Sequence, residues 1–474
     1  MGVRRGLAGS GAYSASAQGG TLRAPRRTRL GWALFDWAQQ PYFTLVGSFL
    51  FRPFFVTAVA ATPAIGQIQI GLTGAAAGLV VALVGPLLGI LLDRGSLKAW
   101  LGWTSLPFVL ACAALWLVVP GEVMATPLAL VCLTAAAILA EVTTTINNAM
   151  LPAIAKPGGI GRLSGFGVAL GCFGGMAAAA IFLLLFLLPQ APFLGLDRAA
   201  HEPERFSGPF AALWYVLFLI PLFLCYPRET RAASASRPLR DLLGLLRALP
   251  RDRVMLRFLV GRMFIADAAA AVQLFGGIIA AATFGWNATE MALFGFTILA
   301  ASGIGAYAAG FADDHLTPKV SVLLTSAMLI VAMLGIGSAA PDRVLYFFPV
   351  DIPADSGFLQ TLPQQLFFAF AITMGVALGP NTGSMRSWMA ELIPAGQAGR
   401  WFGLYAVAGR ATAFAAPLVI SLATALTQQV LSAVPVILLF LVVGILALVM
   451  VPAGRAAPDE GRATAGPGLP RTRR

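Results

Sequence analysis

Three ionisable residues lie deep inside long apolar stretches of this chain: Glu141, Asp267 and Arg410. An ionised side chain near the centre of a bilayer costs about 2.5–3.5 kcal/mol unless it finds water or a partner. A carboxyl group in such surroundings holds a proton more readily, and a nearby cation favours its ionised form. The three residues therefore indicate a site that carries a proton or binds a charged solute. A permanent structural ion-pair network is the alternative.

Other polar residues extend this candidate site. Arg386 is a second cation that could serve one of the carboxylates or hold a substrate carboxylate by paired hydrogen bonds. Asp36 precedes Pro41, which removes a backbone donor and leaves a carbonyl free for a ligand, unless the kink is simply tolerated. The substrate or proton pathway predicted from the sequence comprises Asp36, Gln39, Gln40, Glu141, Asn148, Asp267, Arg386 and Arg410.

The composition requires that these residues be positioned by helices in a membrane. Hydrophobic residues make up 58% of the 474 and charged residues 11%, against roughly a quarter charged in a soluble domain. Stretches of about 20 apolar residues, enough to cross a bilayer as a helix, recur along the chain. We place twelve transmembrane helices, in an all-α membrane protein, at 32–60, 68–92, 99–119, 126–152, 164–188, 209–226, 256–283, 289–311, 318–340, 363–390, 401–424 and 429–451.

The net charge of +12 comes from arginines in loops and tails, which is typical of segments retained in the cytoplasm. This distribution predicts a multi-pass protein of the inner (plasma) membrane with both termini cytoplasmic, and it disfavours nucleic acid as a partner. The four cysteines are scattered singly, and only two histidines are present. We therefore expect no metal site and no cofactor.

Two patterns repeat in the second part of the chain at nearly the same interval. Gly89-Ile-Leu-Leu-Asp93-Arg94 continues to Lys98, and Gly310-Phe-Ala-Asp-Asp314 continues to Lys319. Gly161-Arg162 has a counterpart in Gly399-Arg400. Each pair falls at the same topological position, which predicts two related six-helix halves with the substrate site between them.

The expected organisation has five parts. They are a disordered cytoplasmic tail at 1–29, a six-helix half at 30–226, a cytoplasmic linker at 227–255, a second half at 256–452 and a cytoplasmic tail at 453–474. Leucines and arginines from Pro238 to Leu249 are spaced as in an amphipathic helix on the membrane surface. An unstructured linker is the alternative.

The repeated loop pattern resembles the signature of the major facilitator superfamily. Trp32 to Ala38, Asn148 to Pro152, Trp388 to Pro394 and Gly409 to Phe414 further resemble its vacuole-effluxer, autophagy-related branch. The resemblance implies that Asp93 with Arg94, and Asp314 with Lys319, lock the cytoplasmic helix ends; a purely topogenic role is the alternative. The expected cytoplasmic gate comprises Gly89, Asp93, Arg94, Lys98, Arg162, Gly310, Asp314, Lys319 and Arg400.

The function predicted from these features is secondary active transport, not catalysis, by a monomer. The resemblance implies efflux of a small polar or zwitterionic, amino-acid-like solute by alternating access, and the deep carboxyl groups predict coupling to protons. A non-transporting assembly or sensor protein on the same scaffold and an exporter of amphipathic drug-like compounds are the alternatives. A channel is disfavoured because no ring of filter residues is apparent.

Overall fold

The computed structural model describes residues 24–156, 158–189, 193–227, 238–339, 343–350, 357–394, 396–410, 412–413, 415–427 and 429–454. Most of the two predicted tails and residues 228–237 of the predicted linker lie outside this part of the chain. The first helix begins at Arg26, so the predicted disordered tail is wrong in its last four residues.

Seven helices make up the N-terminal half. They are α1 (Arg26–Pro41), α2 (Phe51–Phe54), α3 (Pro63–Leu92), α4 (Leu97–Ala114), α5 (Ala125–Ile154), α6 (Ile160–Phe182) and α7 (Glu202–Cys225). Wider π-helical turns at Tyr42–Phe49 and Phe55–Val59 flank the short α2, so one bent helical segment runs from Arg26 to Val59. A third π-helical stretch, Leu183–Leu187, extends α6, and 3-10 turns lie at Leu115–Leu117 and Phe193–Gly195.

A linker helix, α8 (Pro238–Ala248), precedes the C-terminal half. It lies within the segment predicted to be an amphipathic helix on the membrane surface. The C-terminal half contains α9 (Arg253–Phe284), α10 (Ala288–His315), α11 (Pro318–Gly337), a hairpin of β1 (Arg343–Val344) and β2 (Phe348–Pro349), α12 (Leu362–Leu392), α13 (Ala398–Ala408), α14 (Ala415–Thr427), a 3-10 turn at Val430–Ser432 and α15 (Ala433–Val449).

Several long helices begin at a side-chain cap followed by proline, which explains where the apolar runs become helical. Thr62, Thr317 and Thr361 each accept a hydrogen bond from a backbone N–H of the first turn. Proline follows directly after Thr62 and Thr317, and two residues after Thr361. Asn287 and Glu290 form a reciprocal capping box at the start of α10. These caps satisfy donors that the bilayer would otherwise leave unpaired.

Ten helical segments in the described chain are long and apolar enough to cross a membrane. The last two predicted spans differ from the prediction of continuous helices. The eleventh is interrupted between α13 and α14, where the described residues Gly409, Arg410, Thr412 and Ala413 form turns. The twelfth is represented by the 17-residue α15 and the short turn before it. Non-helical backbone at membrane depth is tolerated where it lines a cavity, and Arg410 lies in this break.

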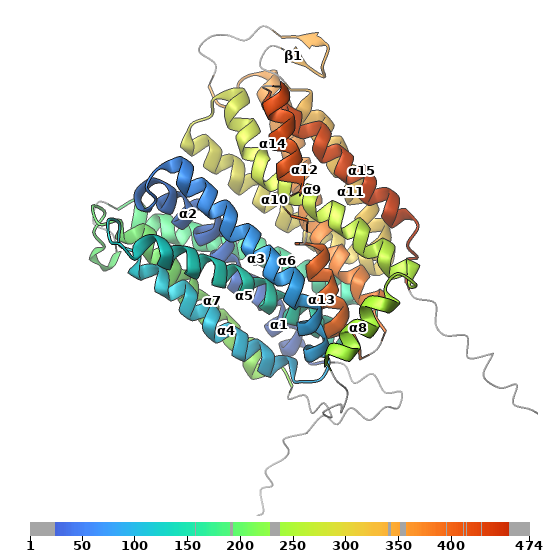
Figure 1. Cartoon of the computed structure of the whole chain (residues 1–474). Helices are drawn as coiled ribbons and strands as arrows, with labels where there is room; N and C mark the ends of the chain where they lie inside the picture. The colour runs from blue at the N-terminus through green and yellow to red at the C-terminus, as the bar shows by residue number, and fades with distance from the viewer. Residues whose placement is uncertain are drawn as a thin grey trace, which may run out of the picture.

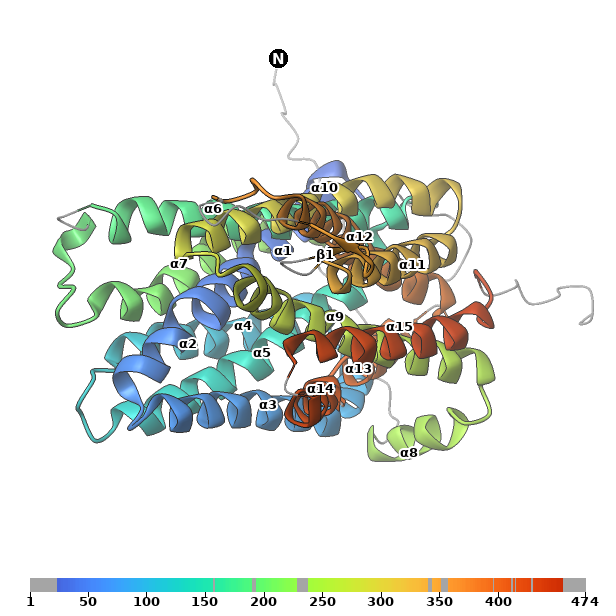
Figure 2. The same ribbon diagram turned by 90° about the horizontal axis from the view of Figure 1, so that it is seen from above.

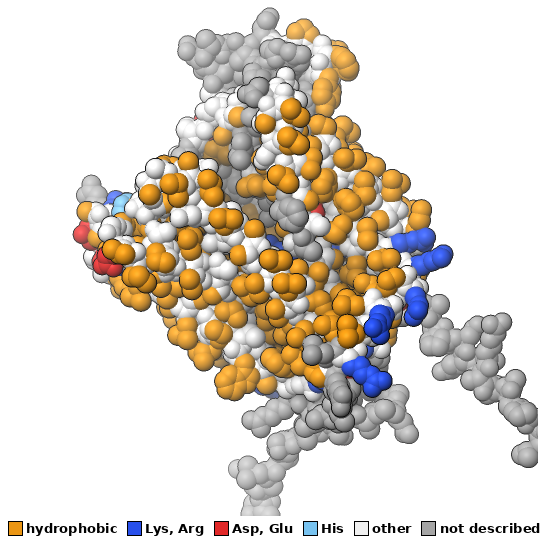
Figure 3. Space-filling view, in the orientation of Figure 1, with side chains coloured by type: hydrophobic (Ala, Val, Ile, Leu, Met, Phe, Trp, Pro, Cys, Tyr) orange, Lys and Arg blue, Asp and Glu red, His pale blue; other side chains and the backbone are white. Residues whose placement is uncertain are grey.

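The two halves lie beside each other as separate groups of helices (Figures 1 and 2). We call the end of the bundle that carries α8 and the turns after α3, α5, α10 and α12 the basic end, and the end that carries the β1–β2 hairpin the far end. Exposed hydrophobic side chains cover most of the face seen in Figure 3, and lysine and arginine gather near the basic end. This surface suits a protein embedded in lipid.

The halves touch most closely through glycine at the basic end. A Cβ atom at Gly89 of α3 would lie 2.5 Å from the carbonyl oxygen of Gly399, and one at Gly165 of α6 would lie 2.4 Å from that of Ala306 in α10. Only glycine allows the backbones to approach so closely. The pairs α3–α13 and α6–α10 therefore hold the halves together on this side.

Candidate functional site

Arg386 of α12 crosses the interface and ends inside the N-terminal half. Its Nη1 donates to Oδ2 of Asp36 at 3.1 Å and to Oδ1 of Asn148 at 3.3 Å. Its Nε donates to the hydroxyl of Ser164 at 2.8 Å, and its Nη2 donates to the Ser164 carbonyl at 2.7 Å. The guanidinium also lies over the ring of Trp32, 4.9 Å from the ring centroid.

This cluster brings together three helices of one half around a cation from the other. The Arg386 side chain is 6% exposed and that of Asp36 16% exposed, so both charges are largely removed from water. A buried ion pair of this kind requires the remaining donors to be satisfied, and here they are met by Ser164 and Asn148. Of the predicted pathway, Asp36, Asn148 and Arg386 thus lie together.

Glu141 and Arg410 form a second pair across the interface. Nη2 of Arg410, in the break between α13 and α14, donates to Oε1 of Glu141 in the middle of α5. The pair lines a cavity of about 280 Å³ between the halves. Tyr42 and Arg52 of the bent first segment and Gln273 of α9 line the same cavity. Its walls therefore present one carboxylate, two guanidinium groups, an amide and a phenol.

Asp267 of α9 is 1% exposed and is not part of either pair. Among the described residues its Oδ1 accepts no hydrogen bond, although the hydroxyl of Thr412 lies beside the carboxylate. Arg410 is thus paired with Glu141 and Arg386 with Asp36, whereas the sequence left the pairing open. Asp267 stays a candidate proton carrier without a described cation partner.

Gln39 was predicted to lie in the substrate or proton pathway, but its side-chain amide forms hydrogen bonds to α5. Its Nε2 donates to the carbonyl of Ala140 at 2.9 Å and to the hydroxyl of Thr143 at 3.0 Å, while its Oε1 accepts from Thr144 at 2.7 Å. These bonds join α1 to α5. The carbonyl that Pro41 leaves without a helical donor is that of Trp37, four residues earlier, and it accepts from Nε1 of Trp214 at 3.2 Å. The kink is therefore satisfied within the protein.

The predicted gate residues form two matching contacts at the basic end. Asp93 at the end of α3 accepts from the N–H groups of Gly399 (2.6 Å) and Arg400 (3.2 Å), and from Nε of Arg400 (2.8 Å). Asp314 of α10 accepts from the N–H groups of Gly161 (2.9 Å) and Arg162 (3.3 Å), and from Nε of Arg162 (2.6 Å). Each carboxylate thus caps the N-terminus of a helix of the other half, α13 or α6, where the helix dipole favours a negative charge.

The other basic residues of the predicted gate bind partners that the sequence did not indicate. Arg94 pairs with Asp241 of α8 at 2.6 Å rather than with Asp93. Nζ of Lys98 donates to the carbonyl of Tyr226 at 3.0 Å, and that of Lys319 donates to the carbonyl of Val449 at 2.8 Å. The arginine that meets each gate carboxylate is instead the one that follows a glycine in the opposite half.

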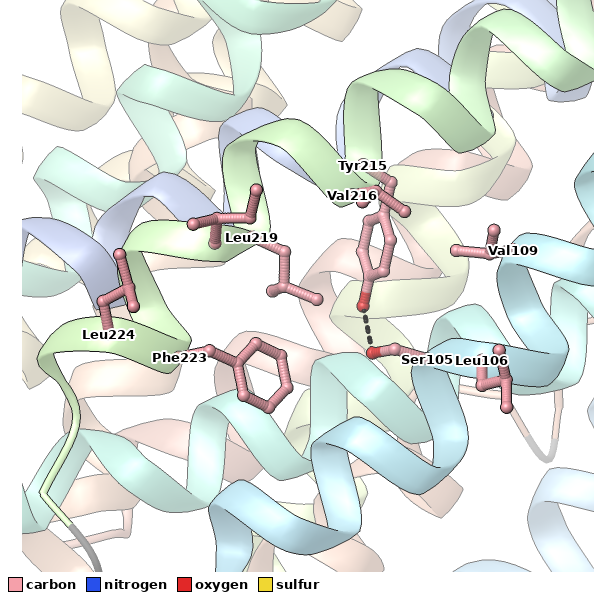
Figure 4. A pocket seen from close by; sticks show the side chains of 9 residues that line it. Ser105, Leu106, Val109, Tyr215, Val216, Leu219, Phe223 and Leu224 are labelled. Carbon is pink, nitrogen blue, oxygen red and sulfur yellow. Dashed lines mark hydrogen bonds between the residues drawn. The ribbon is translucent and has the colours of Figure 1, made fainter.

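The larger cavity described, of about 330 Å³, is an apolar groove between α4 and α7 on the outside of the N-terminal half. Figure 4 shows its lining, with a hydrogen bond of 2.8 Å between the hydroxyls of Ser105 and Tyr215. Both hydroxyls are satisfied by this bond, and the other lining residues are aliphatic or aromatic. The groove contains no charged group, so the candidate site is the cavity between the halves.

Four participants were not predicted as site residues: Ser164, Tyr42, Arg52 and Gln273. Arg52 lines the central cavity from the bent first segment. Ser164 lies between the repeated Gly161-Arg162 and Gly165, but the second copy has Phe402 at its position, so the repeat gave no signal for it. Tyr42 and Gln273 lie in apolar runs, where the sequence does not show which side of the helix faces the cavity.

We expect Asp93→Asn and Asp314→Asn each to loosen the basic end, because both changes replace charge-assisted hydrogen bonds by weaker neutral ones. The effect should be larger at Asp93, since its partner Arg400 is 30% exposed while Arg162 is 49% exposed and better screened by water. About a tenfold shift toward opening is expected for Asp93→Asn.

The measurement is the rate at which a maleimide labels Leu404→Cys, which is buried in α13, in a background without the four native cysteines. The double variant should label faster than either single variant. Equal rates in all variants would show that the two contacts do not hold the basic end closed.

Comparison with known proteins places this arrangement in a family. Residues 72–461 match the model of the family described as vacuole effluxer Atg22 like. The chain is 25% identical over 437 residues to the uncharacterised MFS-type transporter YxiO of Bacillus subtilis (strain 168), covering 89% of this chain and 94% of that protein. It is 24% identical over 310 residues to autophagy-related protein 22 of Cryptococcus neoformans, covering 64% of this chain but 51% of the fungal protein.

Solved structures show the same fold at low sequence identity. The E. coli fucose:proton symporter FucP, in an outward conformation, has a TM-score of 0.67 at 14% identity, with 89% of this chain and 97% of that chain covered. The human organic anion transporter MFSD10 has a TM-score of 0.67 at 15% identity, with 90% and 100% covered. These matches confirm the predicted all-helical major facilitator fold. The chain belongs to the vacuole effluxer Atg22-like family and is a multi-pass membrane transporter of the major facilitator superfamily.

Proposed function

We propose that this transporter moves a small polar or zwitterionic, amino-acid-like solute out of the cytoplasm, with coupling to protons. The observation that carries the proposal is the Glu141–Arg410 pair on the wall of a cavity between the two halves. A carboxylate and a guanidinium on one wall match the two opposite charges of a zwitterion. Arg52, Gln273 and Tyr42 add polar contacts that orient a bound solute.

The charged contacts lie at successive depths from the basic end, and this order supports alternating access. The Asp93–Arg400 and Asp314–Arg162 contacts lie at the basic end, Arg386 and Asp36 lie deeper, and the cavity lies beyond them at mid-depth. All of these contacts join the two halves. Rocking the halves apart at the basic end would break them in sequence and expose the cavity to that side.

We infer that the basic end faces the cytoplasm of a cell whose plasma membrane holds the protein, with both termini on that side. The argument is the excess of lysine and arginine in the loops and the linker at this end. In this orientation the structure is closed to the cytoplasm, and the cavity belongs to the outward-facing state. The protein would act as a monomer, since both halves of the site come from one chain.

Glu141 is the residue proposed to carry the coupling proton. When it is ionised, Glu141 and Arg410 can bind the amino and carboxylate groups of a zwitterion; when it is protonated, it no longer attracts the amino group, so proton and substrate compete for one carboxylate. Glu141→Gln imitates the protonated state permanently. We expect this variant to bind the substrate more weakly and to lose accumulation driven by a pH gradient.

The experiment begins with a thermal-shift screen of the purified protein against amino acids, peptides and organic cations, followed by flux of the stabilising compound in proteoliposomes. Glu122→Gln, in an exposed turn at the far end, is the matched control and should keep pH-driven transport. Intact pH-driven transport by Glu141→Gln would remove Glu141 from coupling. Ligand binding without flux in the unmodified protein would favour a sensor over a transporter.

A further inference from the structure

A buried carboxylate outside the central cavity has no described counter-charge. Asp313 of α10 is 4% exposed and packs against α11 and α12. Its Oδ1 accepts a hydrogen bond of 2.7 Å from the hydroxyl of Ser384 in α12. The hydroxyls of Ser387 in α12 and Ser321 in α11 also lie beside the carboxylate. One carboxylate and three hydroxyls, from three helices, thus converge at one point.

Two of these buried atoms lack a hydrogen-bond partner among the described residues: Oδ2 of Asp313 and Oγ of Ser321. Ser321 is 4% exposed, so neither atom is satisfied by bulk water. Leaving buried polar groups unpaired is costly, and an uncompensated carboxylate is more costly still. The arrangement therefore calls for a positively charged ligand between these atoms.

The surroundings of Asp313 add negative charge rather than neutralise it. Glu391 lies one and two turns beyond Ser387 and Ser384 on the same face of α12, toward the basic end, and it is close enough to interact with Asp313. Asp314 is next in sequence, but its charge is offset by Arg162. The net potential at the cluster is negative, and Glu391 lies on the side from which an ion would enter.

We propose that Asp313, Ser321, Ser384 and Ser387 bind a sodium ion within the C-terminal half. The ligands are all oxygen atoms, which suits a hard cation. A single carboxylate balances one positive charge, so a monovalent ion leaves the buried site neutral, whereas a divalent ion would leave it with an excess charge. This site goes beyond the proposed transport function, because it is separate from the cavity that holds Glu141 and Arg410.

The test is the thermal stability of the purified full chain as sodium chloride is titrated at constant pH and ionic strength, with choline chloride as the replacement salt. Sodium should raise Tm in a saturable manner, and potassium should do so less at equal concentration. Asp313→Asn should abolish the sodium response. Ser321→Ala should weaken the apparent affinity for sodium about fivefold, as expected for the loss of one ligand contact.

Ser338→Ala is the matched control because Ser338 lies next to the opposite end of α11 and is equally buried, at 4% exposure. Its sodium response should equal that of the unmodified protein. A sodium response that survives Asp313→Asn would overturn the proposal. So would a Tm that depends on pH but not on sodium, since a proton would then neutralise Asp313. Because no substrate is needed, the result does not depend on the proposed transport activity.

Discussion

Arg386→Met should abolish transport and lower the free energy of unfolding by about 3–5 kcal/mol, the usual cost of breaking a buried ion pair by removing one partner. The change leaves Asp36 with no cation in surroundings where its side chain is 16% exposed. It also removes the donors that join Asn148 and Ser164 to the other half. The measurements are chemical unfolding in detergent and flux of the identified substrate in proteoliposomes.

A double-mutant cycle separates loss of the ion pair from loss of packing. Asp36→Asn in the Arg386→Met background should recover part of the stability, because the unpaired carboxylate is then removed. Arg205→Met is a matched control: Arg205 is also buried, at 7% exposure, but it bonds the Trp116 carbonyl within the N-terminal half. The control should lose stability and keep transport. Unaltered transport by Arg386→Met would contradict a role for the interface cluster.

Gly89→Ala should hold the basic end open, because the added Cβ would lie 2.5 Å from the Gly399 carbonyl oxygen, a backbone atom that cannot move aside alone. Overpacking of a close contact typically costs about 1–3 kcal/mol, and here the cost falls only on the state in which α3 and α13 touch. The population open at the basic end should therefore rise by about tenfold or more. Faster maleimide labelling of Leu404→Cys is the expected readout.

Gly71→Ala provides the control on the same helix, since a Cβ at Gly71 meets no atom within 4 Å. This change should leave the labelling rate unaltered and stabilise α3 slightly, because alanine favours the helix. Transport by Gly89→Ala should fall even if its substrate affinity is retained. Labelling of Gly89→Ala at the unmodified rate would show that the α3–α13 contact does not control opening.

The fold was predictable from the sequence because a bilayer imposes a simple requirement on length and composition. Ten of the predicted spans correspond to helical segments long enough to cross a membrane. The prediction was wrong for the continuity of the eleventh span, where Gly409 and Arg410 lie in a break. Hydropathy averages over such a break, because the residues on either side remain apolar.

The candidate site was predicted as a set of residue types but not as a set of contacts. The deep charges could be identified because lipid makes them costly, yet the partner of each depends on how distant helices pack. Asp93 was expected to act with its neighbour Arg94, whereas it meets Arg400 from the other half. The repeat of Gly-Arg in the first turns of α6 and α13 was the signal for this pairing.

Asp313 was overlooked because its neighbour Asp314 completes the repeated signature. The first copy of the signature has Leu92 at the position equivalent to Asp313. A charged residue present in one copy and apolar in the other has no place in the shared gate. Comparing the two copies position by position would have singled out Asp313 as a residue with a separate role.

The two gate contacts have the geometry of an isologous interface, although both belong to one chain. Each half contributes one capping carboxylate, Asp93 or Asp314, and receives the other at a glycine-arginine helix start. In a homodimer with twofold symmetry, a single gene would specify both contacts at once. Because the halves are fused in one chain, the two copies of the contact can diverge. One gate contact can then be weakened by mutation while the other still holds the two halves together.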